Sequence, residues 1–208
     1  YNANSILQVS ISVKFLEYNM LNPDDLNIIA NSMQIKGKFM PNATNPDQTI
    51  IEIPPTNATF SNNGVINLAA TNATAPFANM VNYVEEFIIV WEISFDGGNS
   101  WCEIGESNNE LYVTLDIPSS GSSGFSKLFH TTLHYACIHA IGLNDPDEIV
   151  DAIYSEFTDQ EVRKLGSTNA MKYWGDPTGT KDCYFVKQLL EIEDARCGVW
   201  SLFFIDML

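Results

Sequence analysis

The last twelve residues of the chain constrain its fold more than any other segment, because they form an almost uninterrupted apolar run. From Gly198 onward, only Ser201 and Asp206 interrupt it. A helix that is apolar on nearly all sides has no face suited to water, so the run predicts a helix at the centre of a core. Asp194 is expected to cap this helix, which places Cys197 in its first turn.

The first 117 residues have a different pattern, made of short apolar runs separated by turn-forming residues. Several runs alternate polar and apolar side chains, as half-buried strands do. The predicted strands cover residues 6–16, 33–40, 49–53, 64–70, 86–95 and 110–117. A hairpin turn is expected at 96–101, because Gly97 and Gly98 can adopt positive φ without steric cost. This pattern predicts an antiparallel, immunoglobulin-like β-sandwich over residues 1–117.

Helical periodicity replaces the strand pattern after residues 118–124, PSSGSSG, which we interpret as a linker. Residues 145–157 predict an amphipathic helix, with Asp145 as N-cap and Pro146 at the first helical position. Further helices are expected over 128–142 and 180–190. The predicted fold class is therefore α+β and multidomain, with a mainly helical domain at residues 125–208.

Composition excludes several classes of partner. Acidic residues outnumber basic ones by 26 to 10, and the net charge is −16. Such a chain repels a phosphate backbone or an anionic membrane surface, so we expect no nucleic-acid partner. No stretch reaches the roughly 18 continuous apolar residues of a membrane helix, so no membrane span is predicted. Neither a P-loop nor a dinucleotide-binding glycine pattern occurs, and no cofactor is predicted.

The four cysteines show no C-x-x-C pair and no zinc-ligand spacing, which leaves reduced thiols and a single disulfide equally open. His130 and His134 are four residues apart, and Cys137 follows three residues later. A metal site on this helix is one hypothesis. Because no Asp or Glu stands nearby in sequence to complete the shell, we predict no metal there.

Cys197 is the residue best placed for chemistry. The free N–H groups and the positive dipole end of a helix N-terminus favour a thiolate over a thiol. Gly198 leaves room for a substrate carbonyl close to backbone donors, as an oxyanion site requires. An activated cysteine at the start of a buried helix is the arrangement of a thiol nucleophile. The alternative is an ordinary buried cysteine, since free cysteine is among the most buried residue types.

The final segment, DARCGVWSLFFIDML, resembles the nucleophile segment of the transglutaminase-like superfamily, in which a Gly-x-Cys-Gly-x-Trp/Phe pattern opens a buried helix. The match covers about fifteen residues, and Ala195 stands where a Gly is common. The resemblance implies a papain-like fold for the helical part. It also implies that Cys197 is the nucleophile, with its own N–H in the oxyanion hole, and that Trp174 or Gln188 is a further oxyanion donor.

The reaction implied by the resemblance is attack of Cys197 on an amide or peptide carbonyl of a protein or peptide, through an acyl-enzyme, with water or an amine as acceptor. Members of the superfamily carry a catalytic His and then an Asp after the cysteine. Here the sequence ends eleven residues after Cys197, and all three histidines precede it. Without an imidazole the thiol cannot run acyl transfer efficiently. We therefore expect either a fragment of a longer enzyme or an inactive site.

A non-catalytic binding or adhesion protein, with the sandwich as its recognition domain, is the second functional hypothesis. The predicted sandwich-plus-enzyme layout, the acidic composition and the absence of an initiator Met favour an extracellular or cell-surface location. The substrate and the oligomeric state stay open.

Overall fold

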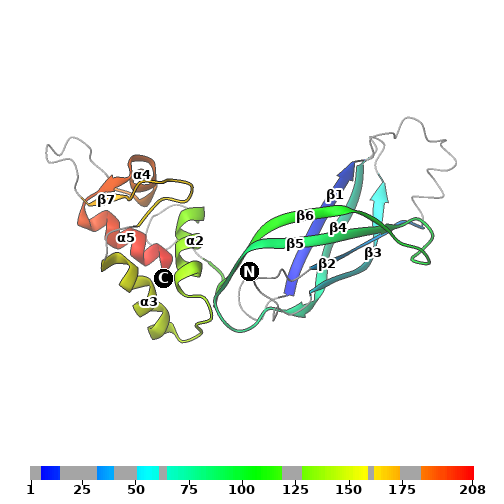
Figure 1. Ribbon diagram of the computed structural model, residues 1–208, viewed down its shortest axis with the longest axis horizontal. Helices are drawn as coiled ribbons and strands as arrows, with labels where there is room; N and C mark the ends of the chain where they lie inside the picture. The colour runs from blue at the N-terminus through cyan, green and yellow to red at the C-terminus, as the bar shows by residue number, and fades with distance from the viewer. Residues whose placement is uncertain are drawn as a thin grey trace. The chain divides into compact units, whose positions relative to one another are not determined.

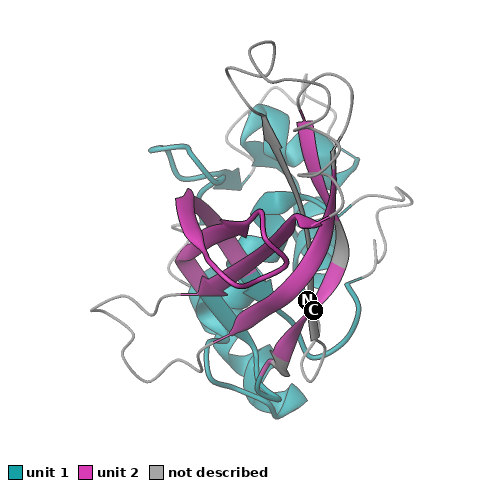
Figure 2. Ribbon diagram, turned by 90° about the vertical axis from the view of Figure 1, so that its right-hand side faces the viewer, with its two compact units in different colours: residues 1–3, 78–83, 112–208 teal, residues 4–77, 84–111 magenta. Residues whose placement is uncertain are grey.

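The computed structural model describes residues 6–14, 32–39, 51–60, 65–118, 128–158, 162–173 and 184–208. Contacts divide the chain into two compact units, which are coloured separately in Figure 2. One unit, residues 4–77 and 84–111, contains most of the strands. The other, residues 1–3, 78–83 and 112–208, contains the helices. We call them the sheet unit and the helical unit.

Among the described residues, six antiparallel strands form one sheet, in the order β1-β4-β3-β2-β5-β6 (Figure 1). The strands are β1 (Ile6–Lys14), β2 (Gln34–Phe39), β3 (Glu52–Phe60), β4 (Val65–Pro76), β5 (Asn82–Ser94) and β6 (Cys102–Val113). The predicted turn joins β5 to β6, where Gly97 and Gly98 have φ values of 71° and 91°. Strand β6 begins well before the predicted position, because its first residues are exposed and lack the apolar alternation on which that prediction relied.

Strand β3 changes partner along its length. Residues 52–57 pair with β2, whereas residues 58–60 pair with β4. The pairing register shifts between Ile35 and Gly37 of β2, opposite Pro54 and Pro55. Proline has no N–H to donate to a ladder, so a proline pair fits at such an irregularity. The predicted strand 49–53 therefore continues past Pro54 and Pro55, as far as Phe60.

The centre of the sheet unit is packed closely around Trp91, which is buried. Gly37 lies opposite it in the β2–β5 ladder, and a Cβ atom there would come within 2.8 Å of the Trp91 ring. Only glycine fits under the indole without displacement. Phe39 and Phe87 stack beside them, with ring centroids 4.4 Å apart.

The helical unit contains α2 (His130–His139), α3 (Pro146–Thr158), α4 (Val186–Ile192) and α5 (Cys197–Met207). Two short strands, β7 (Lys172–Tyr173) and β8 (Asp194–Ala195), pair in parallel. The predicted cap of α3 is confirmed, since the Asp145 carboxylate accepts hydrogen bonds from the N–H groups of Asp147 and Glu148, at 2.9 and 3.2 Å.

Helix α5 differs from the prediction in two respects. Its N-cap is Arg196, and Asp194 lies in β8 instead. Its burial follows one face: Val199, Phe203 and Met207 are buried, at intervals of four residues, whereas Ile205 and Leu208 are 49% and 55% exposed. The few short helices of this unit cover one side of α5 and leave the other side to solvent. The predicted central position is therefore wrong.

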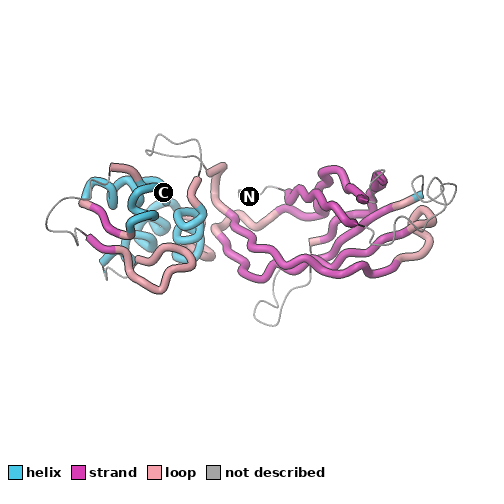
Figure 3. Tube along the Cα trace, turned by 90° about the horizontal axis from the view of Figure 1, so that it is seen from above, coloured by secondary structure: helices cyan, strands magenta, loops and turns pink. Residues whose placement is uncertain are grey.

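The fold is thus α+β, with strands before the helices. Among the described residues, strands β1 to β6 form one curled sheet and β7 pairs separately with β8, while a division of the larger sheet into two face-to-face sheets is not shown (strands magenta in Figure 3). Of the predicted linker, residues 119–124 lie outside the described residues, so the boundary at 118–124 stays a prediction. No helix among the described residues is both long and apolar enough to cross a membrane.

Candidate functional site

Cys197 is the first residue of α5, and its side chain is exposed. Strand β8 leads directly into this helix. Arg196 is extended, with φ −81° and ψ 165°, and its carbonyl accepts hydrogen bonds from the N–H groups of Val199 and Trp200, at 3.0 and 3.3 Å. No side chain caps the first turn. The thiol therefore lies at a helix N-terminus as predicted, and the alternative of a buried cysteine is wrong.

Tyr173 is a polar neighbour of this thiol. It pairs with Ala195 in the β7–β8 ladder, two residues before Cys197. Hydrogen bonding with the Cys197 side chain, reinforced by the negative charge of the ionised thiol, raises the pKa of Tyr173. The Trp200 indole N–H donates to the Lys172 carbonyl at 3.3 Å and so fixes α5 to β7. The pair of Tyr173 and Cys197 is the candidate site.

The other predicted site residues have different outcomes. Gly198 is exposed, and a Cβ atom there would meet no heavy atom within 4 Å, so the space beside the thiol is open. Trp174 lies outside the described residues. Gln188 has a local role, because its Oε1 accepts hydrogen bonds from the N–H groups of Tyr184 and Phe185, at 2.8 and 3.2 Å, at the start of α4.

Each of the three histidines has a polar neighbour within the helical unit. The Tyr112 hydroxyl lies 2.8 Å from Nε2 of His130 and 3.1 Å from Nδ1 of His134. One phenol can donate to one ring and accept from the other. Nδ1 of His139 lies 3.6 Å from a Glu156 carboxylate oxygen. Burial lowers the pKa of His139, an effect that Glu156 partly opposes, so this imidazole is neutral at pH 7.

The described part of the chain contains no group of three or more His, Cys, Asp or Glu side chains that could hold a metal ion. His130 and His134 instead share the Tyr112 hydroxyl. The structure therefore gives the metal-binding hypothesis no support.

Three cysteines lie within the described residues, and all three are free. Cys102 is exposed on β6, and Cys137 is buried on α2, where desolvation raises the pKa of its thiol to about 12. A thiol that stays protonated at physiological pH is a poor nucleophile. Exposure and position at a helix N-terminus therefore distinguish Cys197 from the other two.

Sequence analysis did not identify Tyr173, although it named the neighbouring Trp174. The contact depends on the pairing of β7 with β8, two strands of two residues each. Such short strands carry no detectable periodicity, so the sequence contains no signal that brings Tyr173 to Cys197.

Comparisons of the chain with known protein families, curated proteins and solved structures found no match. The resemblance to the transglutaminase-like superfamily therefore rests on the sequence of residues 194–208 alone.

Proposed function

We propose that the chain carries the nucleophile of a transglutaminase-like thiol enzyme, and that Cys197 is this nucleophile. The observation that carries the proposal is the exposed Cys197 thiol in the first turn of α5, beside the Tyr173 hydroxyl. The thiolate attacks an amide or peptide carbonyl, and an S–C bond forms. The C–N bond then breaks, the amine leaves with a proton, and water or a second amine releases the acyl group.

The surroundings of the thiol suit negative charge. The first N–H groups of a helix have no intrahelical acceptor, and the helix dipole places partial positive charge there. These donors are available both to the thiolate and to the oxyanion of a tetrahedral intermediate. The missing side chain at Gly198 allows a carbonyl to approach them. The Tyr173 hydroxyl is a further hydrogen-bond donor at the same end of α5.

A base is the remaining requirement of acyl transfer. The structure holds the histidines at Tyr112 and Glu156, and the resemblance places the catalytic His and Asp after the nucleophile helix. Activated esters need less assistance from a base than amides do, because their leaving group needs no proton. We therefore expect these 208 residues to be acylated by an activated ester, and amide turnover to require the additional His and Asp.

We extend the proposal to the fold of each unit and to the location of the protein. We propose that the helical unit is the helical half of a papain-like domain and that the curled sheet is an immunoglobulin-like sandwich. The sandwich contributes to recognition of a protein or peptide outside the cell or at its surface. The acidic composition supports this placement, since it disfavours nucleic-acid and anionic membrane partners.

The test is acylation by 4-nitrophenyl acetate, followed by peptide mapping in a mass spectrometer. We expect a rapid first phase in which one acetyl group per chain is attached to Cys197 and one equivalent of nitrophenolate is released. Cys197→Ser abolishes this rapid phase. Cys102→Ser is the matched control, because it removes an exposed thiol that is not at a helix N-terminus, and it leaves the rapid phase intact. Equal labelling of Cys102 and Cys197 would contradict the proposal and favour a non-catalytic binding protein.

A further inference from the structure

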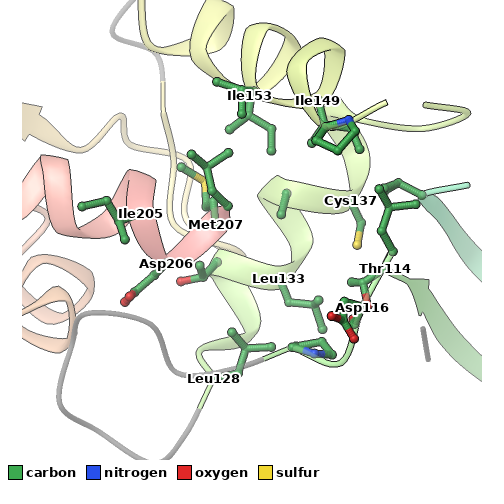
Figure 4. Close-up of a pocket in the computed structure, with 18 of the residues that line it drawn as sticks. Thr114, Asp116, Leu128, Leu133, Cys137, Ile149, Ile153, Ile205, Asp206 and Met207 are labelled. Carbon is green, nitrogen blue, oxygen red and sulfur yellow. The ribbon is translucent and has the colours of Figure 1, made fainter. Parts of the chain in front are cut away.

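A cavity of about 420 Å³ lies in the helical unit, at the end of α5 opposite Cys197 (Figure 4). Its walls come from α2, α3, the last turn of α5 and the segment 114–118. Most of the lining is apolar and includes Leu128, Leu133, Ile149, Ile153, Ile205 and Met207. A volume of this size lies within the range of about 300–1,000 Å³ that is typical of small-molecule sites.

One polar side chain in the lining is buried and unpartnered. Thr132 of α2 is 1% exposed, and within the part of the chain that the structure describes its Oγ1 has no hydrogen-bond partner. A helical threonine commonly donates to the carbonyl four residues earlier, but this one does not. A buried hydroxyl without a partner is unfavourable, and such a group in a native structure needs an explanation. A ligand in the cavity that hydrogen-bonds to Oγ1 supplies one.

Charge restricts the ligand further. Asp116 and Asp206 are among the lining residues, and Figure 4 shows Asp116 next to Thr114. One Asp116 oxygen accepts the Ile117 N–H at 2.7 Å, so its carboxylate is held at the cavity by the backbone. The whole chain carries a net charge of −16. Because like charges repel, an acidic amphiphile such as a fatty acid does not fit this site.

We propose that this cavity binds a small, largely apolar, non-acidic molecule whose hydroxyl or amino group hydrogen-bonds to Oγ1 of Thr132. The apolar part of the ligand packs against the leucine, isoleucine and methionine side chains of the three helices. The site uses residues of α5 that lie at the far end of the helix from Cys197, so it is independent of the thiol chemistry.

The test uses three eight-carbon probes that differ only in their polar group: 1-octanol, octylamine and octanoate. Isothermal titration calorimetry of the 208-residue protein at pH 7 gives a dissociation constant for each. We expect 1-octanol and octylamine to bind with one molecule per chain, and octanoate to bind at least tenfold more weakly. Octanol and octylamine distinguish a hydroxyl from an amino ligand within the same class. No saturable binding of either probe up to its solubility limit would overturn the proposal.

Thr132→Val tests the role of the hydroxyl, because valine has nearly the same shape and no polar atom. It should weaken the binding of 1-octanol about 2- to 10-fold, the usual range for one neutral hydrogen bond. Thr131→Val is the matched control on the preceding residue, which is not part of the lining and whose hydroxyl oxygen accepts the Leu165 N–H at 3.4 Å. This control should leave the affinity unchanged. Equal losses in the two variants would overturn the assignment of Thr132.

Ala136→Leu provides a second test, since Ala136 lines the cavity and the larger side chain occupies part of it. We expect at least a tenfold loss of 1-octanol affinity in a protein whose circular dichroism spectrum is unchanged. Unchanged affinity in this folded variant would show that the octyl chain binds elsewhere, and it would contradict the proposal.

Discussion

The two ends of α5 differ in exposure and in polarity, although the helix is only eleven residues long. The first turn carries the exposed thiol of Cys197, near the hydroxyl of Tyr173, and has no side-chain cap. At the last turn, Ile205 and Met207 line an apolar cavity. The difference shows how one helix can serve two sites: the N-terminus supplies free N–H donors, and the side chains of the last turn supply apolar surface.

Phe203 joins the two ends. Its ring is fully buried, and its centroid lies 6.1 Å from that of Trp200, 6.3 Å from that of Phe157 and 6.4 Å from that of Tyr135. These contacts fix α5 against α2 and α3. Changes at Phe203 should therefore affect both sites, whereas changes at either end should affect one.

The largest expected effect follows from this position. Phe203→Ala removes a fully buried ring and should lower the free energy of unfolding of the helical unit by about 3–5 kcal/mol. Urea denaturation followed by circular dichroism measures the change. Ile205→Ala is the control on the same helix, where the side chain is 49% exposed, and should cost less than about 1 kcal/mol. Similar losses in the two variants would contradict the one-sided burial of α5.

A second prediction contrasts Cys137 with the thiol at the other end of the unit. Desolvation raises the pKa of Cys137 from 9.0 to about 12. Below pH 9 the thiol is protonated in both states. Between pH 9 and 12 it ionises only in the unfolded chain, so the folded protein loses stability as the pH rises, by about 1 kcal/mol per pH unit.

Urea denaturation of the wild type and of Cys137→Ala at pH 8 and at pH 11 tests this directly. The wild type should lose more stability than the variant over that interval, because the variant has no thiol to ionise at this position. Other lysine and tyrosine groups titrate equally in both proteins. A parallel decline would show that Cys137 is accessible to water in the folded state.

A smaller effect is expected where Trp200 holds α5 against β7. Trp200→Phe removes the hydrogen bond to the Lys172 carbonyl and should cost about 0.5–1.5 kcal/mol. It should also change the rate at which iodoacetamide alkylates Cys197. Trp101→Phe is the matched variant in the sheet unit, where the indole N–H donates to the Gly98 carbonyl at 3.0 Å. This control should leave the alkylation rate of Cys197 unaltered, and a change there would contradict a local role for Trp200.

The smallest effect concerns Tyr173. Its pKa is raised above the ordinary 10.0, first by hydrogen bonding with Cys197 and then by the charge of that thiol. Cys197→Ala removes both causes, so the pKa of Tyr173 should fall towards its ordinary value. Nuclear magnetic resonance of ¹³Cζ-labelled tyrosine, assigned with Tyr173→Phe, follows this residue alone. An unchanged pKa of Tyr173 in Cys197→Ala would show that the two side chains do not interact.

The structural features that sequence analysis predicted correctly depend on local signals. The cap at Asp145 depends on the residues that follow it directly, and the glycine turn at 96–101 depends on its own backbone. Cys197 lies in the first turn of α5 as predicted, although the cap from which this was predicted, Asp194, lies in β8 and Arg196 is the N-cap. These features need no knowledge of distant parts of the chain.

The features that were missed or wrong depend on distant partners. Strand β3 continues through Pro54 and Pro55 because β2 accommodates them with a register shift, which the strand's own residues do not reveal. The apolar run in α5 does not indicate how many helices cover it, and Ile205 proved to be exposed. Tyr173 reaches Cys197 only through the β7–β8 pairing. In each case tertiary packing determined the outcome.

Competitive alkylation of the described cysteines in one folded sample tests the central claim most directly. A brief pulse of light iodoacetamide at pH 7, followed by unfolding and heavy reagent, gives the relative rate of each thiol by mass spectrometry. We expect Cys197 to react fastest, the exposed Cys102 to follow, and the buried Cys137 to be protected. A rate for Cys197 no greater than that of Cys102 would contradict the claim that the N-terminus of α5 activates its thiol.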